Sequence, residues 1–412
     1  MGGVGGAAIA PDATGEIVVA LDGRRELVED GAAARLEDEL GRRFPGRRAT
    51  VLVARRHTGE VALAPPGGSV APAAATPEQP AAVTTAGAIP GHESALGALL
   101  REGVQRRAAA VALVAAAPHD ASADWLGLLL APVLEEGFEY VCPTYLRRRT
   151  DALLNTGIIY PLTRALYGHR LRQPLGGEAA ISLSLATRLL DDPDWRRDPG
   201  HAGSDAWLVA KVLAGRHRLC QAWLGAWPRS SGSEEGARET LTRALGLVFR
   251  EMERHASRWQ RVEGSKLVST FGAGGELGGE APRVRVEDLL DTFRLGARDL
   301  APVWALVLPP ATLLALRRAA VAPADAFRLD DHQWARVVYD FAVAHFVKTM
   351  ERRQLLASLT PLYLGWIASF VSETANLDEP AAEARVEALC AAFEREKRYL
   401  ISRWRWPDGF NP

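Results

Sequence analysis

Short apolar runs alternate with segments of helical period through the first half of this chain, and this alternation most constrains its fold. The runs Glu16 to Leu21 and Ala49 to Ala54 contain several β-branched residues, and a helical stretch, Glu26 to Arg43, separates them. This pattern predicts a βαβ unit, in which a right-handed crossover joins two parallel strands. The alternation continues with helix, strand, helix and strand, at His92 to Arg106, Ala109 to Ala116, Ala123 to Glu135 and Phe138 to Pro143. The series predicts an α/β domain on a doubly wound sheet, where ligands bind beyond the carboxyl ends of the strands.

The second half of the chain has an almost unbroken helical period beyond Trp227. Before that point we expect helices at Gly157 to Tyr167, at Ala179 to Leu190 and, capped by Ser204 or Gly203, at Asp205 to Leu213, then a last strand at Arg218 to Leu224. After it, helices are expected at Glu234 to Trp259, Val286 to Val307, Ala311 to Ala320, Asp331 to Met350, Leu355 to Glu373 and Ala381 to Trp404, with a Gly-rich break at Ser269 to Pro282.

These patterns predict four parts of the chain. Residues 1–13 form a disordered leader, and residues 14–230 form the α/β domain, with a Pro/Gly/Ala-rich loop at 62–82. Residues 231–406 form an all-helical domain, and residues 407–412 form a tail.

Composition narrows the expected partners and location. The 49 Lys and Arg residues nearly balance the 50 Asp and Glu residues, so the formal net charge is −1 and no nucleic acid partner is expected. The three cysteines are far apart and suggest no disulfide framework, which fits a reducing cytoplasm. The N-terminus has no secretory signal, and the longest apolar runs reach about half of the roughly 20 residues that cross a bilayer. We therefore expect a cytoplasmic protein without a membrane span.

The segment Arg147 to Ala179, RRRTDALLNTGIIYPLTRALYGHRLRQPLGGEA, is the most informative motif. Its Gly176-Gly177 pair precedes an expected helix near Ala179, and glycines let a backbone approach a ligand closely. Together with Asp151 and Asn155, the segment resembles the acceptor side of bacterial GT-A-fold glycosyltransferases of the mannosylglycerate synthase type, which are similar to glycosyltransferase family 2. The resemblance continues through Gly203 to Trp207 and Cys220 to Gly225.

The resemblance implies a nucleotide sugar as donor and a small polar acceptor, with a role for each matching residue. Arg147 and Asp151 would hold the acceptor, and Asn155 would add a side-chain hydrogen bond. Asp205 would lie near the acceptor hydroxyl, and Glu178 beneath the sugar; these two are the expected catalytic residues. The residues expected to bind substrate are Arg147, Asp151, Asn155, Gln173, Leu175, Gly176 and Gly177. As an alternative, Glu178 and Asp205 would each simply begin a helix, where a carboxylate complements the helix dipole. We expect Arg148 and Arg149 to be solvated residues of a turn after a strand.

The metal site of the family is missing from this sequence. The family places an Asp-x-Asp pair at the end of the strand before the acceptor segment and a His after the last strand. Here those positions are Ala115, Ala116 and Ala117, and a stretch that ends in Arg229. Mg²⁺ and Mn²⁺ require oxygen ligands, so we expect no metal cofactor. His119 and Asp120 follow the alanines, but a lone His-Asp on a loop is more typical of a surface turn.

Three functions remain open at this stage. The first is a pseudo-glycosyltransferase that regulates or assembles with an active paralogue, or forms a homo-oligomer. The second is an active metal-independent transferase that uses Arg55, Arg56 and Arg229 at the diphosphate, since guanidinium groups suit phosphate geometry. The third is a helical scaffold that binds a protein partner.

Overall fold

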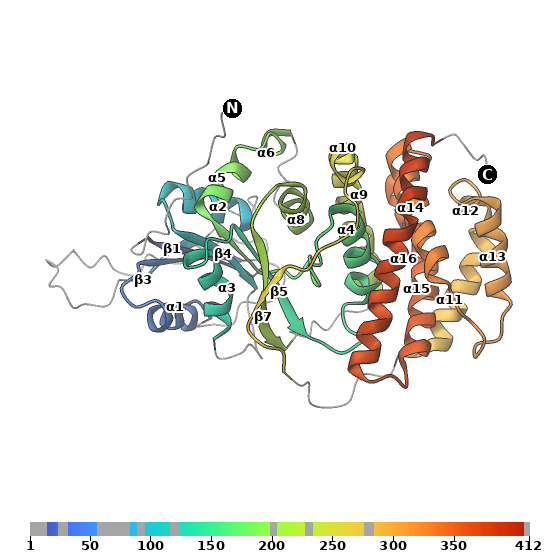
Figure 1. The fold of residues 1–412 in the computed structure, drawn as a ribbon, viewed down its shortest axis with the longest axis horizontal. Coiled ribbons are helices and arrows are strands. Elements are labelled where there is room, and N and C mark those ends of the chain that lie inside the picture. The colour runs from blue at the N-terminus through green and yellow to red at the C-terminus, as the bar shows by residue number, and fades with distance from the viewer. Residues whose placement is uncertain are drawn as a thin grey trace, which may run out of the picture. The chain divides into compact units, whose positions relative to one another are not determined.

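A computed structural model describes residues 15–23, 32–55, 83–88, 95–115, 124–197, 204–226, 234–275 and 284–407. The chain divides into two compact units, which are not contiguous in sequence (Figure 1). The sheet unit contains Met1–Leu146, Gly176–Pro228 and Val268–Gly275, and the helical unit contains Arg147–Leu175, Arg229–Leu267 and Glu276–Pro412. The division predicted at residue 230 was contiguous, so the structure differs from it most at residues 147–175, which lie in the helical unit.

One eight-stranded sheet forms the centre of the sheet unit, in the order β3-β2-β1-β4-β6-β5-β7-β8. The strands are β1 (Ile17–Gly23), β2 (Ala49–Arg55), β3 (Val83–Ala88), β4 (Ala110–Ala115), β5 (Tyr140–Leu146), β6 (Ala179–Ser182), β7 (Leu219–Ala226) and β8 (Ser269–Phe271). The β1–β2 and β1–β4 pairs are parallel, as the βαβ pattern predicts. Strand β6 is antiparallel to both of its neighbours, so the sheet is mixed rather than wholly parallel.

The helices of the sheet unit are α1 (Ala32–Arg43), α2 (Ala95–Gln105), α3 (Trp125–Leu134), α5 (Leu183–Leu190), α6 (Asp194–Arg197) and α8 (Asp205–Ala214). Of these, α1, α2, α3 and α5 pack on strands of the sheet. Helices α1 and α3 share one core with alternate residues of the strands, such as Val19, Val51 and Ala112, each 0% exposed. Helix α2 packs on β1, β4 and α5. Because the strands are buried on both faces, they read as continuous apolar runs in the sequence.

Two sequence predictions are wrong in this unit. Residues 179–182 were expected to begin a helix, but they form β6, and the helix α5 begins only at Leu183. The run Arg218 to Leu224 was expected to be the last strand, but β8 follows it within the Gly-rich break and pairs in parallel with β7. The predicted cap is confirmed, because the Ser204 side chain accepts a hydrogen bond from the Trp207 backbone N–H. The predicted leader at 1–13 and the loop at 62–82 lie outside the described residues.

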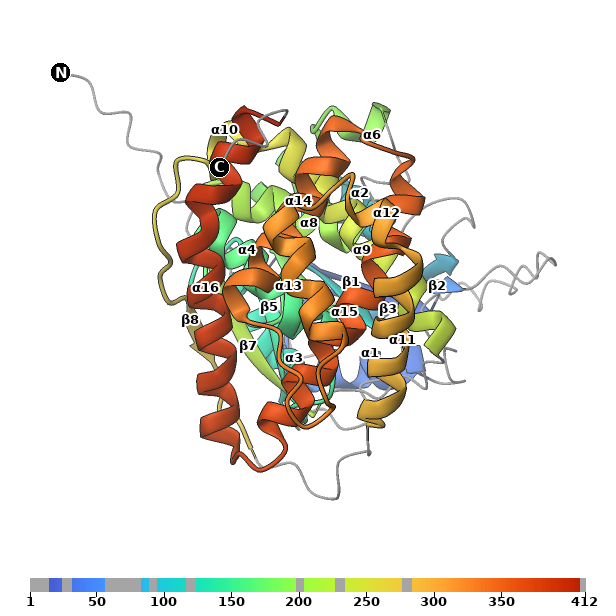
Figure 2. The same ribbon diagram turned by 90° about the vertical axis from the view of Figure 1, so that its right-hand side faces the viewer.

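The helical unit contains helices in all six segments predicted after Trp227, but the segments 234–259 and 286–307 each form two helices rather than one. Its elements are the π-helix η1 (Asn155–Ile159), α4 (Tyr160–Tyr167), α9 (Glu234–Arg254), α10 (Ala256–Trp259), α11 (Val286–Asp299), α12 (Ala301–Trp304), α13 (Pro310–Ala320), α14 (Asp331–Val347), α15 (Arg352–Thr374) and α16 (Glu379–Arg405). Figure 2 shows α16 as a long helix of this unit. The long pairs α11–α15 and α14–α16 pack side by side, and α16 also packs on α4.

Helix α15 is the centre of this unit. Trp366 is fully buried and stacks on Trp334, Tyr363 and Phe370, with ring centroids 5.1–6.2 Å apart. By length and composition α15 could cross a membrane, and it is the one such helix among the described residues. A share of 67% of its most apolar window is buried against the unit, as in the core helix of a folded domain.

Candidate functional site

The carboxyl edge of the sheet contains the first position of the metal motif that the sequence resemblance implies. Ala115 ends β4, and its register partner in β1 is Asp22, a carboxylate only 7% exposed. The methyl group of an alanine supplies no ligand to a divalent ion. Within the described ranges, no three His, Cys, Asp or Glu side chains gather as a metal ion would require. Of the two residues paired at this edge, Asp22 offers one carboxylate and Ala115 no oxygen ligand.

The described residues include none of the remaining positions of the expected metal motif, which are Ala116, Ala117 and Arg229. They also do not include His119 and Asp120. Asp124 is described, at the start of α3, and its Oδ1 lies 2.6 Å from Nε of Arg43. That exposed ion pair assigns Asp124 to the surface between α1 and α3.

Glu178, one of the two predicted catalytic residues, is a buried carboxylate at the start of β6. It is 6% exposed, and the hydroxyl of Tyr145 in β5 donates a hydrogen bond to its Oε2. Burial raises the pKa of the neighbouring Cys142 thiol to about 12, and the negative charge of Glu178 adds to this effect. The alternative interpretation of Glu178 as the first residue of a helix is wrong, because a strand follows it.

The turn before Glu178 depends on glycine. Gly177 has φ +94°, a left-handed conformation that L side chains rarely adopt, and Gly176 precedes it. Both glycines are half-buried and belong to the sheet unit, whereas Leu175 belongs to the helical unit. The Gly-Gly pair therefore directs the chain into β6 and exposes backbone next to the buried carboxylate.

Asp205, the second predicted catalytic residue, begins α8 in the sheet unit. It is half-buried, and a carboxylate in the first turn complements the helix dipole. Burial raises the pKa of the Tyr140 hydroxyl in β5 well above its ordinary value, and the charges of Cys142 and Asp205 add to the rise. Both predicted catalytic carboxylates therefore act electrostatically on side chains of β5.

Helix α8 is fixed by two carboxylates at or just before the start of α6, those of the half-buried Asp192 and the buried Asp194. Lys211 Nζ lies 2.9 Å from Asp192 and 2.8 Å from Asp194, and the indole N–H of Trp207 donates to Asp194 over 3.1 Å. Trp195 packs edge-on against Trp207. These contacts hold the first turn of α8, and with it Asp205, in place.

The predicted acceptor residues lie in the helical unit. Arg147 is half-buried, and Gln173 is 1% exposed. The backbone N–H of Arg148 donates to Oδ2 of Asp151 over 3.0 Å, while the N–H of Asp151 donates to the Arg148 carbonyl over 2.9 Å. Asn155 is 6% exposed, and its Oδ1 accepts no hydrogen bond from any described residue. Arg147, Asp151 and Asn155 thus follow one another along a closed turn and the start of η1.

The π-helix at Asn155 was not predicted from the sequence. Its Gly157 carbonyl accepts a hydrogen bond of 2.9 Å from the Trp334 indole, and a Cβ at Gly157 would come within 2.2 Å of the Trp366 ring. Single π-turns are rare and often occur at functional sites. The sequence Gly157-Ile158-Ile159 has no local signal for a π-helix. The contacts that Gly157 makes are with Trp334 and Trp366, which are far away in the sequence.

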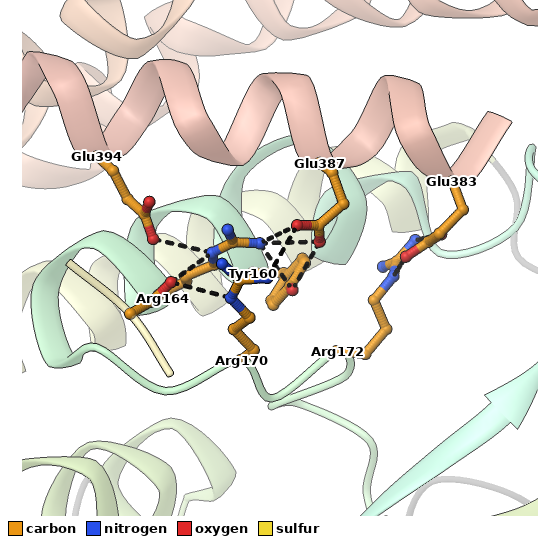
Figure 3. A network of polar contacts seen from close by, with 8 residues as sticks. Tyr160, Arg164, Arg170, Arg172, Glu383, Glu387 and Glu394 are labelled. Atoms are coloured by element: carbon orange, nitrogen blue, oxygen red, sulfur yellow. Dashed lines mark hydrogen bonds and ion pairs between the residues drawn. The ribbon is translucent and has the colours of Figure 1, made fainter. Parts of the chain in front are cut away.

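Sequence reasoning also missed an ion-pair network around Arg164 (Figure 3). The Arg164 side chain is 3% exposed, and its guanidinium contacts Glu387 at 2.7 Å and Glu394 at 2.9 Å, both on α16. Nε also donates to Ser265, and the Tyr160 hydroxyl lies 3.2 Å from Nη1. Nearby, Arg172 pairs with Glu383 of the same helix. The i, i+4 spacing of Tyr160 and Arg164 was visible in the sequence, but their partners on α16 were not.

The structure also corrects the interpretation of Arg149. It was taken as a solvated turn residue, yet it is half-buried and its guanidinium donates to the carbonyl of Thr374 and, over 2.6 Å, to that of Leu377. These carbonyls lie at the end of α15 and in the loop before α16.

Comparison with known proteins gives a likeness only among solved structures. No protein-family model and no curated protein matches the chain. Glucosyl-3-phosphoglycerate synthase from Mycobacterium tuberculosis in complex with Mn²⁺, UDP-glucose and glycerol 3-phosphate is 17% identical, with a TM-score of 0.35, over 58% of this chain and 80% of that one. Its complex with UDP is 17% identical with a TM-score of 0.34, over 59% and 81% of the two chains. Its complex with phosphoglyceric acid is 16% identical with a TM-score of 0.33, over 58% and 80%.

These identities and TM-scores transfer no activity to this chain. The architecture itself, a mixed sheet with flanking helices and a helical C-terminal region, fits the predicted α/β, GT-A-like fold class.

Proposed function

We propose that this chain is a GT-A-type glycosyltransferase-family protein that binds a nucleotide sugar and a small polar acceptor but has little catalytic capacity. The observation that carries the proposal is the residue type at the end of β4, where the related enzymes would have a metal ligand: the residue is Ala115, the register partner of the buried Asp22, and an alanine supplies no oxygen ligand. The mixed sheet, the Gly176-Gly177 turn and the carboxylates Glu178 and Asp205 around β5 support the sugar-binding part.

The chemistry explains why transfer would be slow. Departure of a nucleoside diphosphate places negative charge on its β-phosphate, and a divalent cation normally stabilises that charge. Loss of such stabilisation costs several kcal/mol, and each ~1.4 kcal/mol is a tenfold change in rate. Binding is less affected, because the backbone at Gly176 and Gly177 and the side chains of Arg147 and Asp151 do not need a metal to contact sugar and acceptor.

The proposal includes partners and a location. A chain that binds substrates without efficient turnover would regulate an active paralogue or act within a homo-oligomer, in the cytoplasm. Light scattering of the purified chain, alone and mixed with an intact relative from the same genome, would detect either assembly.

Calorimetry with UDP-glucose, with and without Mn²⁺, tests the central claim. We expect binding that Mn²⁺ does not strengthen and that Glu178→Gln weakens. The matched control is Glu135→Gln, which changes an exposed carboxylate at the end of α3. A turnover assay with D-glycerate and 3-phosphoglycerate should give no product above the rate without protein.

Each contrary result has a separate meaning. Binding that Mn²⁺ strengthens would contradict the loss of the metal site. Rapid turnover without metal would favour a metal-independent transferase with arginines at the diphosphate. A failure to bind UDP-glucose or other nucleotide sugars would contradict the family function and favour a helical scaffold.

A further inference from the structure

We infer that Arg149 is a positioning residue, which holds the acceptor-binding turn in shape by anchoring it to the end of helix α15. The inference rests on the proposed function, because that function gives Arg147, Asp151 and Asn155 their role at the acceptor. Arg149 lies between Arg147 and Asp151 in the sequence. We expected its guanidinium to be solvated. Instead, the guanidinium donates to backbone carbonyls far along the chain, the first of them at Thr374, 225 residues later.

The anchor has a clear physical basis. The last carbonyls of a helix have no partner within the helix and carry partial negative charge. Nη1 of Arg149 donates to the carbonyl of Thr374, the last residue of α15, and to that of Leu377 over 2.6 Å. Thr374 is fully buried, and its carbonyl also accepts from the Leu377 N–H over 3.1 Å. A charged donor to buried carbonyls makes a stronger hydrogen bond than a neutral one.

The turn itself needs such an anchor. Ala152, directly after Asp151, has φ +48°, which is unusual for a residue with a side chain. Backbone of this kind persists where its surroundings determine it. The two hydrogen bonds between Arg148 and Asp151 close the turn from within, and Arg149 holds it from outside. Without the anchor, the turn is free to relax at Ala152, and Arg147 and Asp151 change their relative orientation.

The consequence concerns the class of acceptor. A guanidinium at Arg147 and a carboxylate at Asp151, held at fixed orientation, suit a small molecule with both a carboxylate or phosphate group and hydroxyl groups. Because Arg149 is itself engaged by carbonyls of α15 and its following loop, it positions this pair rather than contacting the acceptor. The end of α15 therefore takes part in acceptor selectivity.

The test compares Arg149→Met with Arg149→Lys in the full-length protein. The control is Arg352→Met. Arg352 is the first residue of α15, at the opposite end of the helix from Thr374, and its substitution removes an ion pair of 2.8 Å with Glu253 of α9. Affinity for D-glycerate and for 3-phosphoglycerate is measured by calorimetry, affinity for UDP-glucose is measured in parallel, and amide exchange is followed across residues 148–152.

We expect Arg149→Met to weaken binding of the acid probes by about tenfold and leave UDP-glucose affinity unchanged within about twofold. Exchange at the Asp151 amide should rise, because its hydrogen bond to Arg148 opens. Arg149→Lys should have an intermediate effect, since its ammonium keeps the charge without the planar fork. Arg352→Met should change neither acid binding nor exchange in the turn.

Two results would overturn the inference: unchanged exchange at residues 148–152 in Arg149→Met, or acid affinity equal to that of the wild type. Failure of the wild-type protein to bind either acid contradicts the proposed acceptor class instead. In that case the exchange measurement, which needs no ligand, still decides whether Arg149 fixes the turn, so the two failures are distinguishable.

Discussion

Gly157 leaves no room for a side chain. Its carbonyl accepts from the Trp334 indole, and an added Cβ would lie 2.2 Å from Cζ3 of Trp366. Both tryptophans are fixed by stacking within a closely packed core, so neither can move without disturbing its neighbours. The π-helix η1 therefore packs directly against the aromatic core of the helical unit at Gly157.

Substitution of Gly157 by alanine should destabilise the protein. Overpacking of this kind costs about 1–3 kcal/mol, and we expect a loss of unfolding free energy in that range by urea titration. Gly41→Ala is the control, because nothing lies within 4 Å of a Cβ at that helical position. Alanine there should stabilise the protein slightly, through its better helix propensity. Equal stability of Gly157→Ala and the wild type would show that the tryptophan pair is looser than the structure indicates.

At the scale of elements, local pattern predicted the helices well and the short strands poorly. The six helical segments expected after Trp227 all occur, since each has an amphipathic or apolar period long enough to identify. The four residues of β6, Ala179–Ser182, have no such signal, and alanine favours a helix. Their strand conformation comes from pairing with β4 on one side and β5 on the other, which depends on distant parts of the chain.

The candidate site shows the same limit. A sequence resemblance along one segment grouped Arg147, Asp151 and Asn155, and the structure places them along one turn and the following π-helix. Sequence could not identify Tyr145 as the partner of Glu178, or the carbonyls that engage Arg149, because both contacts join different elements. Partners of that kind depend on the tertiary fold rather than on sequence spacing.

The pairing of α4 with α16 gives a prediction at this scale. Arg164→Met removes the cation that both Glu387 and Glu394 contact, and leaves Glu387 with the more distant cation of Arg170 at 3.6 Å. Removal of one partner of a buried pair costs about 3–5 kcal/mol; because the glutamates are partly exposed, we expect about 2 kcal/mol. Chemical denaturation measures the loss. Arg298→Met, which breaks an exposed ion pair with Asp299, should leave stability unchanged, and an equal effect of the two variants would contradict a special role for the network.

The whole molecule does not divide at a single point in the sequence. Residues 147–175 belong to the helical unit, where Gly157 accepts from α14, Arg149 donates to the end of α15 and Arg164 pairs with α16. The predicted boundary at residue 230 separates this segment from all three helices. The segment's apolar residues, such as Ile158 and Leu162, are fully buried in the complete chain.

A fragment that ends at residue 230 should therefore fail to fold cooperatively. We expect it to aggregate or to show a broad thermal transition without near-ultraviolet circular dichroism, because an exposed apolar segment cannot be stable in water. The full-length chain is the control. A soluble monomeric fragment with a sharp transition would show that the segment folds against the sheet unit alone.

The backbone passes between the two units five times, at residues 146–147, 175–176, 228–229, 267–268 and 275–276. A gene with this layout cannot exchange one unit for that of a relative by a single recombination event, because any one breakpoint joins pieces of both. Natural variants of this protein should therefore inherit sheet and helices together, and changes in what it recognises must arise by point substitution rather than by module shuffling.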